Sequence, residues 1–231
     1  MMCTQIAQRG LAAAPARFVL AGFMALVLGG CSSIIGPGPS PKLYTLNPSF
    51  ERAAAGEPVN WQLVVATPVA TQSLDSVRIA LSQTPLTMDY YANAVWVDRA
   101  PVMVQGLLVH AFEKSGQISA VARDNGSIRP DYILQTELRN FEARYDVPDT
   151  APVAVVHIGA RIIAIPSRKV IGVSEANEEV QASANSVPAV VDAFNRATGA
   201  AIAKITTWTL RTAPAIDEEA APDRRTQRRR H

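Results

Sequence analysis

The sequence predicts an α+β domain in which two amphipathic helices cover one face of a largely antiparallel sheet. Three consecutive stretches alternate apolar and polar residues with period two, over 132–139, 153–164 and 169–181. This pattern is typical of strands with one face on a core and the other in water or on a partner. Two other stretches repeat apolar residues at helical spacing. Together they predict two packed layers.

Short apolar runs predict the strands of the first half of the chain. Proline or asparagine follows several of them, which favours strand ends at those points. The turn of a hairpin is predicted at Tyr91-Ala92-Asn93. The predicted strands cover residues 42–46, 61–66, 74–81, 86–91, 93–97 and 118–122.

Both helices have recognisable starts. The first is predicted to be capped by Asp98 or Ala100, with Pro101 in its first turn and a stop at Ser115-Gly116. Its apolar face comprises Val104, Leu107, Leu108, Ala111 and Phe112. The second begins at Ser186 with Pro188 in its first turn. Its stripe continues past Gly199 and comprises Val187, Val190, Val191, Phe194, Ala201, Ile202, Ile205 and Trp208.

Residues 1–30 have the layout of a bacterial export signal: Arg9 and Arg17, then an apolar run, then small residues. The run of about 11 residues is shorter than the ~20 needed to span a membrane. Leu28-Gly29-Gly30-Cys31 resembles a lipobox, so we expect cleavage before Cys31 and lipidation of its thiol, with palmitate among the acyl chains. Two or more chains anchor a protein stably. An ordinary secretory signal is the alternative. Ser32, where Asp would retain the protein at the inner membrane, indicates the outer membrane and a periplasmic domain.

Composition predicts three parts after the leader. Residues 31–41, rich in Ser, Gly and Pro, form a lipidated tether, and 42–211 form the folded domain. Residues 212–231 carry a block of acids followed by arginines and are predicted to be a disordered charged tail. The alternative for the arginines is attraction to anionic headgroups or cell wall. Without the leader the chain has 20 basic and 20 acidic residues, which argues against nucleic-acid binding.

No sequence signal indicates chemistry. We find no nucleophile elbow and no phosphate-cradling glycine loop. Cys3 leaves with the leader and Cys31 is acylated, so neither a disulfide nor a Cys/His metal site is expected. We therefore predict no catalytic residue, no metal and no cofactor, and a protein that is not an enzyme.

The polar and aromatic side chains that stand out have structural interpretations. His157, with Arg161 on the same predicted polar face, is interpreted as a surface or pocket-edge residue. Asp75 and Arg78 are expected to pair locally. The three tryptophans are expected in the core or at an interface: Trp61, Trp96 and Trp208.

The order of these segments resembles the ABC-type transport auxiliary lipoproteins, the PqiC-like family that accompanies MCE-domain lipid transporters. After the Cys31 lipobox come 43–46, then 74–80, which is similar to the family's "YLDRPQIV", and 94–101, which resembles its "RWAEPL". Residues 131–142 resemble its "Y-x-L…F" strand. Ser76 and Val77 stand where Arg and Pro are usual. The resemblance covers roughly 31–211.

The resemblance implies a fold similar to the N-terminal domain of TolB and a non-catalytic docking role. It also implies partners, namely an MCE-domain protein with its ABC permease and ATPase, a membrane reached through the lipid anchor, and a homo-oligomeric ring such as related members form. The alternative is a lipoprotein of the same fold that regulates a cell-wall synthase or lines a secretion assembly. A third possibility, a lipoprotein hydrolase, requires a nucleophile beside a base.

Overall fold

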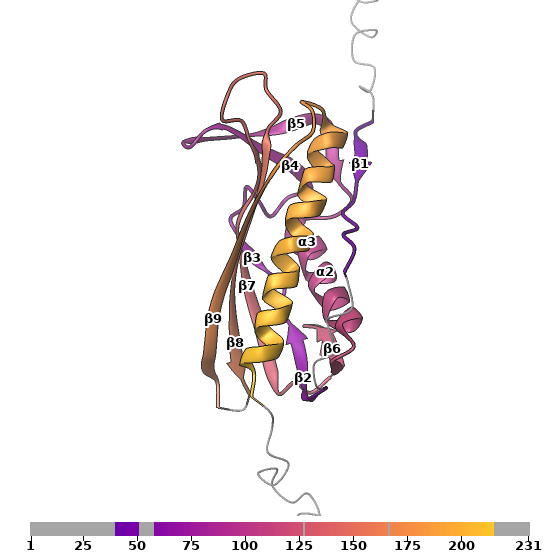
Figure 1. Cartoon of the computed structure of the whole chain (residues 1–231), viewed down its shortest axis with the longest axis vertical. Helices are drawn as coiled ribbons and strands as arrows, with labels where there is room; N and C mark the ends of the chain where they lie inside the picture. Colours follow the sequence, from indigo (N-terminus) through magenta and orange to yellow (C-terminus); the bar gives the residue numbers. More distant parts are fainter. Residues whose placement is uncertain (1–39, 51–57, 127, 166, 215–231) are drawn as a thin grey trace, which may run out of the picture. The chain divides into compact units, whose positions relative to one another are not determined.

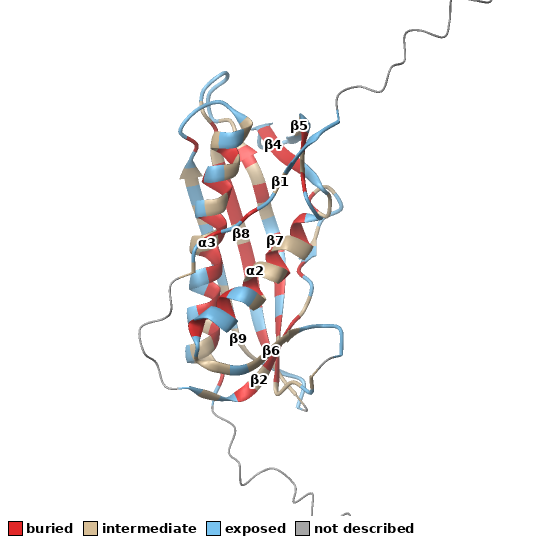
Figure 2. Ribbon diagram, turned by 90° about the vertical axis from the view of Figure 1, so that its right-hand side faces the viewer, coloured by how far each residue is buried: buried red, intermediate tan, exposed pale blue. Residues whose placement is uncertain are grey.

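Two helices lie on one face of a nine-stranded mixed sheet, as the computed structural model of residues 40–50, 58–126, 128–165 and 167–214 shows (Figures 1 and 2). The predicted leader, Cys31, residues 31–39 of the tether and the tail from residue 215 lie outside the described residues. The helices are α2 (Ala100–Ser115) and α3 (Val187–Thr212). The strands are β1 (Lys42–Tyr44), β2 (Val59–Val65), β3 (Val69–Ala70), β4 (Arg78–Thr84), β5 (Thr87–Trp96), β6 (Ile118–Arg123), β7 (Tyr132–Arg144), β8 (Val153–Ala164) and β9 (Lys169–Gln181). The predicted α+β class is confirmed.

Strand β7 is the centre of the sheet. One of its edges pairs with β8 in antiparallel register from Tyr132↔Ala164 to Arg144↔Val153. Its other edge is shared by β2, β3 and β4, which follow one another along β7 and all run parallel to it. Beyond them, β6 pairs with β2, β5 with β4 and β1 with β5. The long pairings are thus antiparallel, as predicted, and the short ones are mostly parallel.

The three strands with the clearest alternation are confirmed. Strands β8 and β9 have the predicted bounds, and β7 continues past the predicted residue 139 to Arg144. Alternate residues of β7 and β8 are buried beneath the helices: Leu134, Thr136, Leu138, Ala154, Val156, Ile158, Ala160 and Ile162. The opposite side of β7, β8 and β9, away from α2 and α3, is called the outer face below.

Two predictions for β4 and β5 are wrong. Residues 74–77 form a turn, so β4 begins at Arg78 instead of residue 74. Thr87–Trp96 is one strand, and its hairpin turn lies at Pro85-Leu86. The predicted turn falls on an irregularity, where the β4–β5 register shifts and Asn93 has φ 55°. Asn tolerates this left-handed conformation, and a bulge admits extra residues without ending a strand.

The helices follow their predicted bounds with one difference at a cap. The N-cap of α2 is Arg99, without a side-chain cap hydrogen bond, where Asp98 or Ala100 was predicted. Asp98 Oδ1 instead accepts the backbone N–H of Arg99 at 2.7 Å. Gly116 ends α2 in the left-handed region at φ 68°, which suits glycine. Ser186 is the N-cap of α3, as predicted.

The core lies between the sheet and the helices, where Figure 2 shows buried residues along the facing sides of α3, β7 and β8. Three aromatic rings meet in it. Phe194 of α3 lies 5.5 Å from Trp96 and 4.9 Å from Phe141, measured between ring centroids. Trp61 packs edge-on against Tyr132 at 5.4 Å. The prediction of core tryptophans is confirmed for Trp61 and Trp96, whereas Trp208 is half-buried.

Candidate functional site

Three of the motif stretches that carry the family resemblance meet at one corner of the sheet. Strand β1 lies beside the end of β5, where Val97 N–H donates to the Tyr44 carbonyl at 2.8 Å. Trp96 N–H donates to the Val77 carbonyl at 2.7 Å, and Ala100 N–H to that of Ser76 at 3.2 Å. Residues 43–46, 74–80 and 94–101 are therefore joined through their backbones. We call this region the β1 corner.

The predicted local pair of Asp75 and Arg78 is wrong. The carboxylate of Asp75 accepts from Arg99 instead, with N–O distances of 2.8 and 2.9 Å. The guanidinium of Arg78 lies 3.7 Å from the centroid of the Tyr90 ring, a cation–π contact. The turn at 74–77 separates the two side chains, because it carries Asp75 toward the start of α2 while Arg78 enters β4.

A second group of charges crosses the middle of the outer face. Arg139 of β7 donates to Glu137 at 3.1 Å and to Glu175 of β9 at 2.7 Å. His157 of β8 lies 3.3 Å from the same Glu175 carboxylate. The hydrogen bond and charge of His157, followed by the charge and hydrogen bond of Arg139, hold the pKa of Glu175 below its usual value. His157 and Arg161 do lie on the polar side of β8, as predicted.

A third group lies nearer the β4–β5 hairpin. Arg144 donates to Asp146 at 2.7 Å and to Glu179 at 2.8 and 3.0 Å. The hydrogen bonds from Arg144 lower the pKa of both carboxyls. The side chains on β7 and β9 bridge across β8, because alternate residues of neighbouring strands project to the same face.

Two hollows flank these charges on the outer face. One, of about 570 Å³, has Arg139, Arg161, Val170 and Val173 in its lining. The other, of about 620 Å³, lies beside the β4–β5 hairpin, and its lining includes Leu86. Apolar side chains at the rim of a fixed charge pattern suit recognition of a complementary surface.

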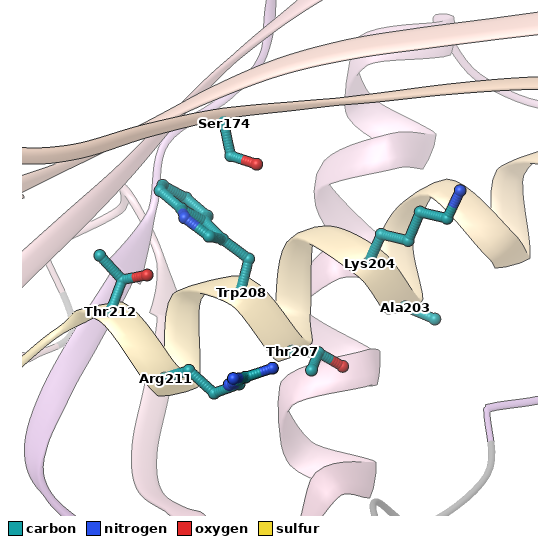
Figure 3. Close-up of a pocket in the computed structure, with 7 residues that line it drawn as sticks. All are labelled: Ser174, Ala203, Lys204, Thr207, Trp208, Arg211 and Thr212. Atoms are coloured by element: carbon teal, nitrogen blue, oxygen red, sulfur yellow. The ribbon is translucent and has the colours of Figure 1, made fainter.

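A further cleft, of about 720 Å³, lies between α3 and β9 (Figure 3). Trp208 and Lys204 reach from α3 toward the strand on either side of Ser174. Lys204 pairs with Glu178 at 2.5 Å. A Cβ at Gly172 would lie 3.1 Å from the Trp208 ring, so the missing side chain allows the ring to approach β9.

The contact made by His157 bears on the hydrolase alternative. His157 contacts a carboxylate, whereas a nucleophile–base pair would place it beside a hydroxyl or thiol. Among the described residues, no three His, Cys, Asp or Glu side chains are grouped so that they could hold a metal ion. Within the same part of the chain, no helix has both the length and the apolar character needed to cross a membrane.

Comparison with known families decides the assignment. The family model described as the ABC-type transport auxiliary lipoprotein component matches residues 44–206, from the last residue of β1 into α3. The chain belongs to this family. The match lies within the predicted domain 42–211 and confirms the resemblance seen in the sequence. As a member of the auxiliary lipoprotein family, the protein is a component associated with a transport system.

Solved structures agree with the family assignment. The chain is similar to a Xanthomonas campestris protein of family DUF330, with 32% identity over 74% of this chain and 95% of that one and a TM-score of 0.70. An uncharacterized protein shares the fold at 13% identity, with a TM-score of 0.57 over 74% of this chain and 99% of its own. Comparison of this chain with curated proteins gives no match.

Sequence reasoning found the motifs of this auxiliary lipoprotein but missed how they are joined. The Arg99–Asp75 pair joins residues 24 positions apart, and no local pattern indicates it. The cross-strand pairs of the outer face had only a partial signal. Glu175 and Glu179 share one face of β9, but they lie opposite Gly159 and Val155 of β8, and their arginine partners are one strand further away on β7. Cys31, the predicted lipidation site, lies outside the described residues.

Proposed function

We propose that this protein is a lipid-anchored, non-catalytic docking component of an ABC/MCE-type system that moves lipids or other hydrophobic compounds across the cell envelope. The observation that carries the proposal is the family match over 44–206. In this role, acylated Cys31 holds the domain at the outer membrane, facing the periplasm. The folded domain then receives an MCE-domain protein, which is linked to its ABC permease and ATPase.

The outer face of the sheet is the surface we propose for the MCE-domain protein. Its ion pairs fix the positions of charges on β7, β8 and β9, and the pairing of strands makes their spacing rigid. Val173 of β9 is 72% exposed beside the hollow at Arg139. An apolar residue next to a fixed charge pattern provides both contact area and orientation to a protein partner.

Affinity capture from solubilised envelopes tests this role. We expect an MCE-domain protein to be captured with the tagged full-length chain and to be lost with Val173→Glu. The matched control is Val147→Glu, the same substitution at a 57% exposed valine in the loop after β7. Capture that is equal for both variants would move the docking surface elsewhere. Capture of a penicillin-binding protein instead would favour the cell-wall alternative.

The anchor has a separate test. Mass spectrometry of the mature protein should show a chain that begins at Cys31 and carries acyl chains. Cys31→Ser should retain the leader and leave the protein unacylated. An intact leader or a free thiol in the wild-type protein would refute the anchored role.

A further inference from the structure

The β1 corner carries an apolar row that ends on a cation. In the sheet register, Leu43 of β1 lies opposite Val95 of β5, and Val95 lies opposite Arg78 of β4. Residues paired in this way project to the same face of a sheet. Leu43 is 65% exposed, and Val97, two residues after Val95, is 52% exposed. The corner therefore presents aliphatic side chains and a guanidinium side by side.

Arg78 of the corner and Lys42 beside it differ from the arginines of the outer face. Arg139 and Arg144 are held by carboxylates, whereas Arg78 lies over the ring of Tyr90 at 3.7 Å and Lys42 lies 5.4 Å from the ring of Tyr44. A cation on an aromatic ring keeps its full charge. Tyrosine, with an apolar body and a polar tip, suits the boundary between lipid and water.

The acids nearby have partners other than Arg78 and Lys42. Asp75 is paired with Arg99, and Asp98 accepts the backbone N–H of Arg99. Within the corner Arg78 and Arg99 equal the two acids in number, and Lys42 at the start of β1 adds one positive charge beside it. Among the described residues, no carboxylate pairs with Arg78 or Lys42, so these two cations are available to anionic headgroups, where each basic residue contributes about 1 kcal/mol.

The chain length places this corner near the predicted anchor. Ten residues separate Cys31 from Lys42, the first residue of β1. At no more than ~3.6 Å per residue they reach about 35 Å. This reach is similar to the length of helix α3 in Figure 1, whose 26 residues at 1.5 Å each extend about 39 Å. An acylated Cys31 therefore keeps the β1 corner within reach of the bilayer surface.

We propose that the β1 corner docks on the lipid surface that holds the anchor, with Leu43 and Val97 among the headgroups and Arg78 beside anionic phosphates. The inference rests on the proposed anchoring at Cys31. The lipid anchor already holds the domain close to the bilayer, so the effective concentration of lipid at the β1 corner is high. Weak lipid binding by the corner therefore suffices to orient the domain.

Single added cysteines test the contact, because the mature chain otherwise contains only Cys31. Val97→Cys replaces an exposed valine just after β5, and the control Val173→Cys replaces an exposed valine of β9. Each added cysteine is labelled with an environment-sensitive fluorophore. The full-length lipidated protein is reconstituted in phosphatidylglycerol-containing vesicles that carry a lipid-attached quencher. We expect quenching at 97 and none at 173. Arg78→Gln should lower the ratio of docked to undocked label about fivefold, the equivalent of ~1 kcal/mol.

The outcomes separate this proposal from the anchoring on which it rests. A wild-type protein that fails to float with the vesicles refutes the anchor and the docking with it. Flotation with equal quenching at 97 and 173, or with none at either, overturns the docking alone and leaves the anchor standing. Quenching at 97 that is unchanged in Arg78→Gln and on neutral phosphatidylcholine vesicles overturns the role of charge.

Discussion

One guanidinium nitrogen of Arg99 lies 2.8 and 2.9 Å from the two carboxylate oxygens of Asp75. The pair ties the start of α2 to the turn before β4. It thereby joins two stretches that carry the family resemblance and that are separated by the whole β4–β5 hairpin. Both side chains are substantially exposed, at 50% and 36%.

We expect the Arg99–Asp75 pair to fix geometry more than to add stability. Exposed ion pairs contribute about 0.2–1 kcal/mol, and salt weakens them. A double-mutant cycle with Arg99→Ala and Asp75→Ala, read by urea unfolding, should give a coupling free energy in that range that falls as NaCl is raised. A coupling of several kcal/mol that ignores salt would contradict this expectation.

Phe194 should be far more important to stability. Its ring is fully buried against Trp96 and Phe141, so Phe194→Ala removes contacts and leaves a cavity. Such changes cost about 3–5 kcal/mol in the free energy of unfolding. The control is Val173→Ala, at a mostly exposed position, which should change it by less than about 0.5 kcal/mol. Equal denaturation midpoints for the two variants would show that the aromatic cluster is not a packed core.

Two glycines should respond to alanine in opposite ways. At Gly172 an added Cβ would lie 2.7 Å from Thr212 Cγ2 and 3.1 Å from the Trp208 ring, so Gly172→Ala should cost about 1–3 kcal/mol through overpacking. At Gly106 the close atom is the flexible end of Arg123, and alanine is favoured by about 1 kcal/mol inside a helix. Gly106→Ala should therefore be neutral or stabilising.

Thermal unfolding and the tryptophan emission spectrum, to which Trp208 contributes with Trp61 and Trp96, check the glycine pair. Gly172→Ala should lower the midpoint and shift the emission, because the ring must leave its place on β9. The same loss of stability in Gly106→Ala would show that backbone effects, and not the contact with Trp208, dominate.

Acid should weaken the outer face through Arg144. The folded protein holds the pKa values of Glu179 and Asp146 below their usual values, through hydrogen bonds from Arg144. Unfolded Glu and Asp titrate at about 4.3 and 3.9. The stability from these groups is complete above about pH 5 and is lost as pH falls through the depressed folded values. The free energy of unfolding should therefore fall more steeply below pH 5 in the wild type than in Arg144→Gln. If the free energy of unfolding falls with pH in the same way in the wild type and in Arg144→Gln, the hydrogen bonds of Arg144 are not the cause of the acid sensitivity.

The parts of the fold that were predictable are those with a strong local pattern. Strands β8 and β9 alternate over 12 and 13 residues, so one register alone buries their apolar side. Both helices begin near a proline in the first turn, and Gly116 ends the first where a left-handed residue is needed. These signals come from neighbours in sequence and do not depend on the rest of the molecule.

The parts that were missed depend on distant partners. Asn93 looks like a turn residue, yet β5 continues through it because β4 pairs with both flanking segments. Strand β3 has two residues and forms only because β7 offers an edge beside it. Likewise, nothing near Asp75 in the sequence indicates that Arg99, and not Arg78, is its partner.

The shared edge of β7 dictates an order of assembly. Strands β7, β8, β9 and helix α3 are consecutive, so they can form a hairpin meander from short loop closures. Strand β4 can pair early with β5, but β2 and β4 reach their places beside β7 only after a partner that lies 62 to 69 residues further along the chain is present. We expect the carboxyl-terminal half to nucleate folding and to serve as the template on which the earlier half condenses. The segment that leaves the ribosome first is then the last to acquire its native structure.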